Sequence, residues 1–80
     1  MISRAFKRLF KSEQGQIGRT AQRVLADLAG YCFADKSTFH DNALIMARRE
    51  GRRDVWLRIK GYLNLDEAQV QQIMEIDDEY

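Results

Sequence analysis

The sequence predicts an all-α protein, a small bundle of three to four helices with an amphipathic helical arm at its N-terminus. Three observations favour this fold class. The 80 residues include no proline, they contain no Asn-Gly or Asp-Gly pair of the kind that closes tight β-hairpins, and four segments repeat apolar residues every three or four positions, as one face of a helix requires. The 45% hydrophobic and 31% charged content suits one folded core and neither a disordered tail nor a membrane span.

The first periodic segment, residues 2–11, is expected to form a helix with opposed apolar and basic faces. Its apolar side chains are Ile2, Phe6, Leu9 and Phe10, and its basic ones are Arg4, Lys7, Arg8 and Lys11. Gly15 and Gly18 then interrupt the pattern, at a cost in helix propensity of about 1 kcal/mol each. We therefore divide the chain into a basic arm over residues 1–14, a helical domain over residues 15–76 and an acidic tail over residues 77–80, with a hinge at the two glycines.

A second helix is expected over residues 19–33, because one face carries a continuous apolar stripe. The stripe consists of Ala21, Val24, Leu25, Leu28 and Ala29. A polar connection follows over residues 35–38, and Phe39 is expected to pack back against the core as an anchor.

The third helix is the longest, beginning at Asp41 or Asn42 and ending at Leu63. Apolar or small residues recur along it at Leu44, Ala47, Gly51, Val55, Ile59 and Tyr62. Ala47 and Gly51 leave so little side-chain bulk that the backbone of a neighbouring helix can approach closely. Gly51 could instead break the segment into two helices.

The fourth helix has the clearest start signal in the chain. Asp66 is the expected N-cap and Gln69, three residues later, completes a capping box that satisfies two backbone amides. Val70, Ile73 and Met74 supply its apolar face. The tail that follows is acidic, so the chain is basic at one end and acidic at the other, although its net charge is only +1.

Reactive side chains are few. Cys32 and His40 could in principle pair, but nucleophilic catalysis also needs an orienting group and a cleft, which a domain this small seldom encloses. We predict no catalytic residue, no metal site and no cofactor, and hence no enzyme. Cys32 lies in an apolar run and is expected to be a buried, reduced thiol, and residues 1–11 lack the apolar stretch of a secretory signal, so we expect synthesis in the cytoplasm.

A cluster of arginines on the third helix is the strongest candidate for molecular recognition. It comprises Arg48, Arg49, Arg52 and Arg53. Three interpretations stay open. Glu50 and Asp54 allow an ordinary solvated face of paired charges, the guanidinium groups could clamp acidic groups of a neighbouring protein, or, with Trp56 one turn away, they could contact the phosphates and bases of nucleic acid.

The arm could be a core helix, a helix that binds a partner, or a helix that lies on a membrane surface. About ten residues are few for stable membrane attachment, so packing against protein is favoured. We predict a protein interface that also includes Trp56, which lies off the centre of the apolar stripe. The interface residues are Ile2, Phe6, Leu9, Phe10 and Trp56. If the bases of one arm met the acidic tail of another subunit, the contact would build rings or arrays.

The central region resembles a family of small all-helical domains encoded by tailed bacteriophages, in particular podophages of the Bordetella type. The resemblance covers residues 19–63 and rests on three stretches: Arg19-x-x-x-Arg23-Val24-Leu25-Ala26-Asp27-Leu28-Ala29-x-Tyr31-Cys32, then Thr38-Phe39, then Arg49-Glu50-Gly51-Arg52-Arg53-x-Val55-x-Leu57-x-Ile59. Such genes lie among those for head, portal and tail proteins. The resemblance therefore implies a non-enzymatic virion or morphogenesis protein, associated with the virion after synthesis in the host.

These observations lead to three functional hypotheses. The first is a phage protein that self-associates or docks onto a head, portal, tail or ejection assembly, with other phage structural proteins or itself as partner. The second is a small nucleic-acid-binding module, whose affinity would fall steeply with salt. The third is a host-takeover protein that binds a bacterial protein.

Overall fold

Four helices make up the part of the chain that the computed structural model describes, residues 2–76. They are α1 (Ile2–Phe10), α2 (Arg19–Tyr31), α3 (Ala43–Leu63) and α4 (Glu67–Met74). No β-strand occurs among these residues, so the predicted all-α class is confirmed. The acidic tail, residues 77–80, lies outside the described residues.

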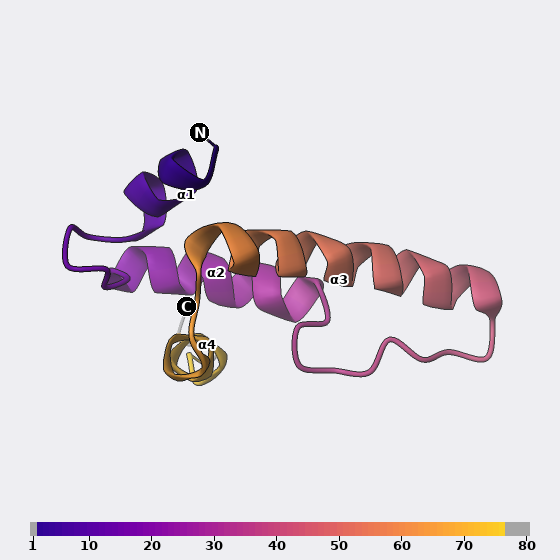
Figure 1. Ribbon diagram of the computed structural model, residues 1–80. Helices are drawn as coiled ribbons and strands as arrows, with labels where there is room; N and C mark the ends of the chain where they lie inside the picture. The colour runs from indigo at the N-terminus through magenta and orange to yellow at the C-terminus, as the bar shows by residue number, and fades with distance from the viewer. Residues whose placement is uncertain (1, 77–80) are drawn as a thin grey trace.

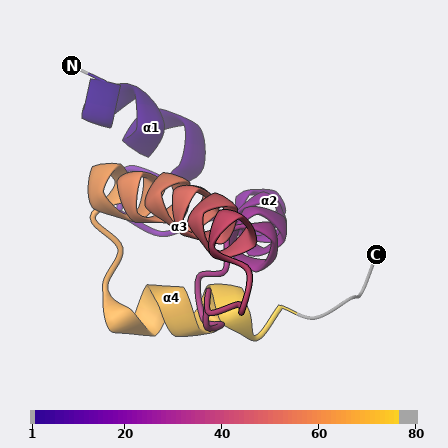
Figure 2. The ribbon, with the colours of Figure 1, turned by 90° about the vertical axis from the view of Figure 1, so that its right-hand side faces the viewer.

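Helices α2 and α3 lie side by side and form the central layer of the molecule (Figure 1). Helix α1 lies against one side of this layer and α4 against the other, as a second view shows (Figure 2). The described part of the chain is elongated, with principal extents of 44 × 33 × 20 Å. The N-terminal half of α3 projects beyond the end of α2, and the connection between the two helices runs beneath it to the start of α3 (Figure 1).

The hydrophobic core lies where α2, the C-terminal half of α3 and α4 meet. Its buried side chains in the described residues are Leu25, Ala29, Cys32, Trp56, Ile59, Leu63, Leu65 and Ile73. No residue between 43 and 55 is buried, so the first half of α3 contributes nothing to this core. That half contacts the α2–α3 connection instead, through Arg49, Glu50 and Arg53.

Helix boundaries follow their local capping signals closely. The side chain of Asn42 accepts hydrogen bonds from the amides of Leu44 and Ile45 at the start of α3. At the start of α4, Asp66 and Gln69 form the predicted capping box. Helix α3 runs through Gly51 without a break, because a single mid-helix glycine costs only about 1 kcal/mol.

The segment between α1 and α2 differs from the predicted hinge. It is a closed turn in which the amide of Gly15 donates to the carbonyl of Ser12 (2.9 Å) and the amide of Ser12 donates to the carbonyl of Gln16 (2.7 Å). Gly15 takes a φ of +80°, a conformation that glycine adopts without strain. The Nε2 of Gln69 donates to the Gly15 carbonyl (3.1 Å), so α4 fastens the turn from the far end of the chain.

Candidate interaction surfaces

Three of the four clustered arginines hold the end of α2 and the α2–α3 connection against α3. We call Arg49, Arg52 and Arg53 the arginine clamp. Arg53 donates from Nη1 to the carbonyl oxygen of Phe33 (2.9 Å) in a partly buried hydrogen bond, and Arg49 donates from Nη1 to the carbonyl oxygen of Phe39 (3.2 Å). Both carbonyls belong to the connection, so these guanidinium groups replace the backbone partners that an irregular segment lacks.

Aromatic contacts complete the arginine clamp. The Arg52 guanidinium carbon lies 4.3 Å from the ring centre of Tyr31, and that of Arg49 lies 5.2 Å from the ring centre of Phe33. Both distances suit cation–π attraction. Phe33 also has a φ of +56°, which is strained for a residue other than glycine. The arginine clamp therefore holds both the ring and the carbonyl of the most strained residue in the connection.

Glu50 of α3 makes a further contact with the α2–α3 connection. The hydroxyl of Thr38 donates to the carboxylate of Glu50. Phe39, in contrast, is 67% exposed, so its expected role as an anchor in the core is wrong. Its carbonyl, not its ring, fixes this part of the connection, through Arg49.

The outer face of α3 is open. We use this name for Leu44, Ala47, Gly51 and Val55, all of them exposed, with Leu44 at 82% and Val55 at 50%. Nothing beyond α3 itself in the described chain lies within 4 Å of the position that a Gly51 side chain would occupy. The predicted close approach of a second helix at Ala47 and Gly51 is therefore not made within the chain, and the small residues there remain available to another molecule.

Helix α1, the helical part of the predicted arm, packs against α3. The ring of Phe6 lies 5.0 Å from that of Tyr62 and 6.4 Å from that of Phe10, measured between ring centres. Phe6 and Phe10 pack partly buried against the core, whereas Ile2 and Leu9 stay exposed. Of the four interface residues predicted in this helix, two therefore pack inside the fold and two lie on its surface.

Trp56, the fifth residue of the predicted interface, lies in the core and is only 2% exposed. It shares one side of α3 with Ile59 and Leu63, at spacings of three and four residues. The outer face follows the same helical period about a third of a turn away, which is why the apolar pattern of α3 predicts no unique core stripe. As a core residue, Trp56 is unavailable to a partner.

Leu9 lines an apolar groove between α1 and α2 that sequence reasoning missed. Its remaining lining residues are Phe10, Gly18, Arg19, Thr20, Ala21 and Val24. Leu9 is 76% exposed and Val24 is about half exposed. The groove arises only when the turn at Gly15 brings the end of α1 beside the start of α2, so no local sequence signal reveals it.

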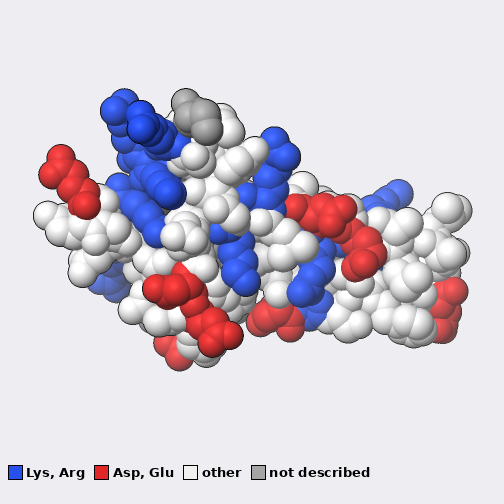
Figure 3. All heavy atoms as spheres, in the orientation of Figure 1, with Lys and Arg blue, Asp and Glu red and all other residues white. Residues whose placement is uncertain are grey.

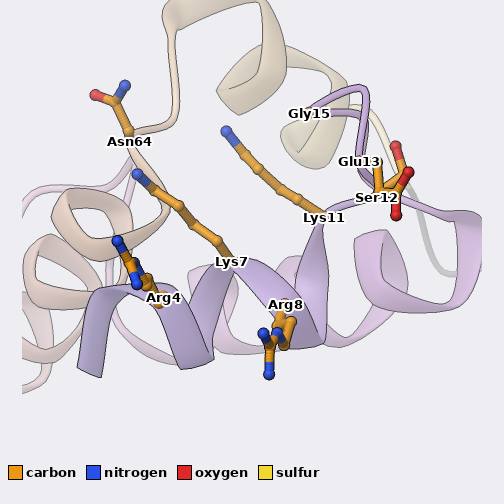
Figure 4. A pocket seen from close by; sticks show the side chains of 8 residues that line it. All are labelled: Arg4, Lys7, Arg8, Lys11, Ser12, Glu13, Gly15 and Asn64. Carbon is orange, nitrogen blue, oxygen red and sulfur yellow. The ribbon is translucent and has the colours of Figure 1, made fainter. Parts of the chain in front are cut away.

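The bases of α1 surround a shallow hollow at the edge of the molecule (Figure 4). We call this the basic hollow; its lining residues are Arg4, Lys7, Arg8, Lys11, Ser12, Glu13, Gly15 and Asn64. Lys7 and Lys11 extend toward the side on which Asn64 lies, while Arg8 points the other way (Figure 4). In the space-filling view the basic side chains gather over α1 (Figure 3). Glu13 is the one acid among the lining residues.

Comparison with known proteins places this arrangement in a family. The profile of the Bbp19-like phage proteins matches residues 6–75. The chain belongs to the Bbp19-like phage protein family. No curated protein and no solved structure matches it.

The Bbp19-like match extends beyond the resemblance recognised over residues 19–63. It includes residues 6–10 of α1 and all of α4, which means that the C-terminal half of α1 and the capped fourth helix belong to the family region. The three stretches that carried the resemblance also meet in space, because Thr38 bonds Glu50, Arg49 bonds the Phe39 carbonyl and Arg52 stacks on Tyr31. Many residues of this pattern therefore hold the α2–α3 connection of the Bbp19-like chain against α3.

The two reactive side chains of the Bbp19-like chain, Cys32 and His40, lie in different surroundings. Burial raises the pKa of the Cys32 thiol, and nearby Arg52 lowers it by less, which disfavours the nucleophilic thiolate. His40 accepts a hydrogen bond at Nδ1 from the amide of Asn42. Within residues 2–76 no group of three or more His, Cys, Asp or Glu side chains could hold a metal ion, and none of the described helices has the length and hydropathy needed to cross a membrane.

Proposed function

We propose that this phage protein is a non-enzymatic assembly component, which self-associates or docks onto other phage structural proteins in a head, portal, tail or ejection complex. The observation that carries the proposal is the amount of apolar surface that the described fold leaves uncovered. Beside a core of eight small and large side chains, nine large hydrophobic residues are exposed. Exposed apolar residues that form contiguous patches often mark the surfaces on which partners bind.

The uncovered residues gather on surfaces that suit protein partners. Leu9 and Val24 border the groove between α1 and α2, and Leu44 and Val55 lie on the outer face of α3. A core this small contributes only a few kcal/mol of stability, so association through these surfaces would also stabilise the fold. Binding to a virion assembly supplies both the partner and the stabilisation.

The experiment is analysis of purified particles of the phage that encodes the chain, together with its assembly intermediates, by quantitative mass spectrometry. We expect the protein in particles or intermediates, and we expect Leu9→Ser with Val24→Ser, or Leu44→Ser with Val55→Ser, to reduce its incorporation. The matched control is Gln71→Ser with Gln72→Ser, which alters two exposed polar residues of α4. Absence from particles and from every intermediate would overturn the proposal and favour a host protein as partner.

A second candidate function, nucleic-acid binding, is favoured by the basic hollow. The arginine clamp is engaged within the chain, whereas Lys7 and Lys11 line the basic hollow (Figure 4). Nucleic-acid binding should then depend on α1, fall steeply as salt rises, and be lost in Lys7→Gln with Lys11→Gln. A lack of binding to short single- and double-stranded oligonucleotides at low salt ends this candidate.

A further inference from the structure

The basic hollow presents its cations along a single short helix. Arg4, Lys7 and Lys11 follow one another at spacings of three and four residues, so they lie in one row on α1. At 1.5 Å per residue, the row rises by about 10 Å from its first member to its last. The three side chains form no hydrogen bond or ion pair with the described residues. The described fold therefore leaves their positive charge available to a ligand.

The rest of the lining suits a charged backbone better than a base or another ring. Ser12 and Asn64 add polar side chains at the edge, and no aromatic residue lines the hollow. The rings of α1 lie elsewhere, because Phe6 and Phe10 pack against the core. Single-stranded nucleic acids are held largely by stacking of their bases on aromatic side chains. The basic hollow lacks that means of binding and offers only contacts to anions.

The choice of anion follows from the exposure of the cations. Arg4 and Lys7 are exposed, and water weakens each ion pair that an exposed cation forms with a single carboxylate. A flexible acidic segment of a protein would also lose conformational entropy on binding. A nucleic-acid duplex is already ordered and carries one phosphate charge per about 1.7 Å of its axis. Each phosphate that a cation neutralises releases condensed counterions, so weak contacts add up to measurable affinity.

We propose that the basic hollow binds the phosphate backbone of a nucleic-acid duplex, through about three phosphates and without preference for sequence. This inference rests on the second candidate function, nucleic-acid binding, and names its ligand class. The net charge of the chain is only +1, so the field of the whole molecule attracts a polyanion weakly. Binding therefore depends on the basic side chains that gather over α1 (Figure 3).

Glu13 gives the proposal a test of opposite sign. It is exposed and is the one acid among the residues that line the basic hollow. A carboxylate at this position repels a phosphate backbone and lowers its affinity. Removing its charge should therefore strengthen binding, whereas most substitutions in a binding site weaken it.

The experiment titrates a fluorescently labelled DNA duplex with the full-length chain and follows fluorescence anisotropy between about 50 and 200 mM salt. A second DNA duplex of unrelated sequence tests for sequence preference. An RNA duplex of the first sequence distinguishes DNA from RNA as the source of the backbone, and the separated single strands test for stacking of bases. Circular dichroism verifies that every variant keeps its helices.

The affinity of the wild-type chain for both DNA duplexes should fall by about 40-fold over this salt range, because three phosphate contacts give a slope of log K against log salt of about −2.7. Lys7→Gln with Lys11→Gln leaves one contact, so it should bind more weakly and lose only about 3- to 4-fold over the same range. Glu13→Gln should bind roughly two- to fivefold more tightly than the wild type. The matched control, Lys36→Gln with Arg48→Gln, removes two exposed bases outside the hollow and should keep the wild-type slope.

Several results would overturn the inference. If no duplex binds at about 50 mM salt, the inference and the second candidate function fail together. If single strands bind more tightly than duplexes, or if the change at Lys7 and Lys11 leaves the affinity intact, the inference fails while nucleic-acid binding by other means survives. Tighter binding of a polyglutamate peptide than of the duplex would assign the basic hollow to an acidic protein segment. The particle experiment tests the assembly function independently of all these results.

Discussion

Arg53 offers the sharpest test of how the fold is held together. Arg53→Met keeps the helix propensity and the aliphatic stem but removes the 2.9 Å hydrogen bond to the Phe33 carbonyl. A hydrogen bond to a charged group contributes about 1.5–3 kcal/mol, and partial exposure of this one lowers the expected loss to about 1–2 kcal/mol. The loss should appear in urea unfolding followed by far-UV circular dichroism.

The same change should open the connection locally. Lys36 is exposed in the connection, and a loss of 1–2 kcal/mol should raise tryptic cleavage after it by about 5- to 30-fold. Arg49→Met should act in the same direction by about 1 kcal/mol, because its hydrogen bond is longer and exposed (3.2 Å) and its cation–π contact adds a fraction of a kcal/mol.

Arg48→Met is the matched control, since Arg48 belongs to the same cluster but is exposed and makes no polar contact with the described residues. Its unfolding free energy should stay within about 0.5 kcal/mol of the wild type. Equal effects of Arg48→Met and Arg53→Met would refute the arginine clamp, because they would show that loss of a positive charge, and not loss of the Phe33 contact, is what matters.

Three further predictions concern the core, the fourth helix and the thiol. Trp56→Ala should lower the unfolding free energy by about 3–5 kcal/mol, whereas a surface interface residue would leave the stability of the monomer nearly unchanged; denaturant unfolding at low protein concentration separates the two. Asp66→Ala should cost about 1 kcal/mol by removing an N-cap, and Gln69→Ala should cost more, since Gln69 also donates to Gly15; a smaller effect of Gln69→Ala would contradict the role of this bond. Because burial raises the pKa of the Cys32 thiol, the unfolded thiol, with a pKa of about 8.5, loses its proton first. Wild-type stability should therefore fall more steeply than that of Cys32→Ala as pH rises above about 8.5, and parallel curves would show that Cys32 makes no contribution.

Features encoded by neighbouring residues could be predicted from the sequence. Asp66 and Gln69 identify the start of α4 because a capping box is complete within four residues. The apolar period likewise places α2 and α3 within two residues of their observed ends, apart from frayed termini. In both cases the signal and the structure involve the same few side chains.

Features that depend on contacts between distant residues could not be predicted in the same way. Two stripes of α3 have nearly the same period, and only the position of α2 and α4 decides that Trp56 is buried while Leu44 and Val55 are exposed. The partners of Arg49 and Arg53 are backbone carbonyls. Because every residue has a carbonyl, the residue types along the chain do not indicate which ones these arginines bind. The arginine cluster can be identified from the sequence, but the α2–α3 connection that it binds cannot.

The docking of α1 has a consequence for the order in which the chain is made. Helix α1 is synthesised before Tyr62, against which Phe6 packs, and before Gln69, which donates to the turn after α1. Until then, the Phe6 and Phe10 side of a strongly basic helix has no place to bind within its own chain. Completion of α3 and α4 is therefore the step that covers this surface, and a chain that ends before Tyr62 would leave it exposed.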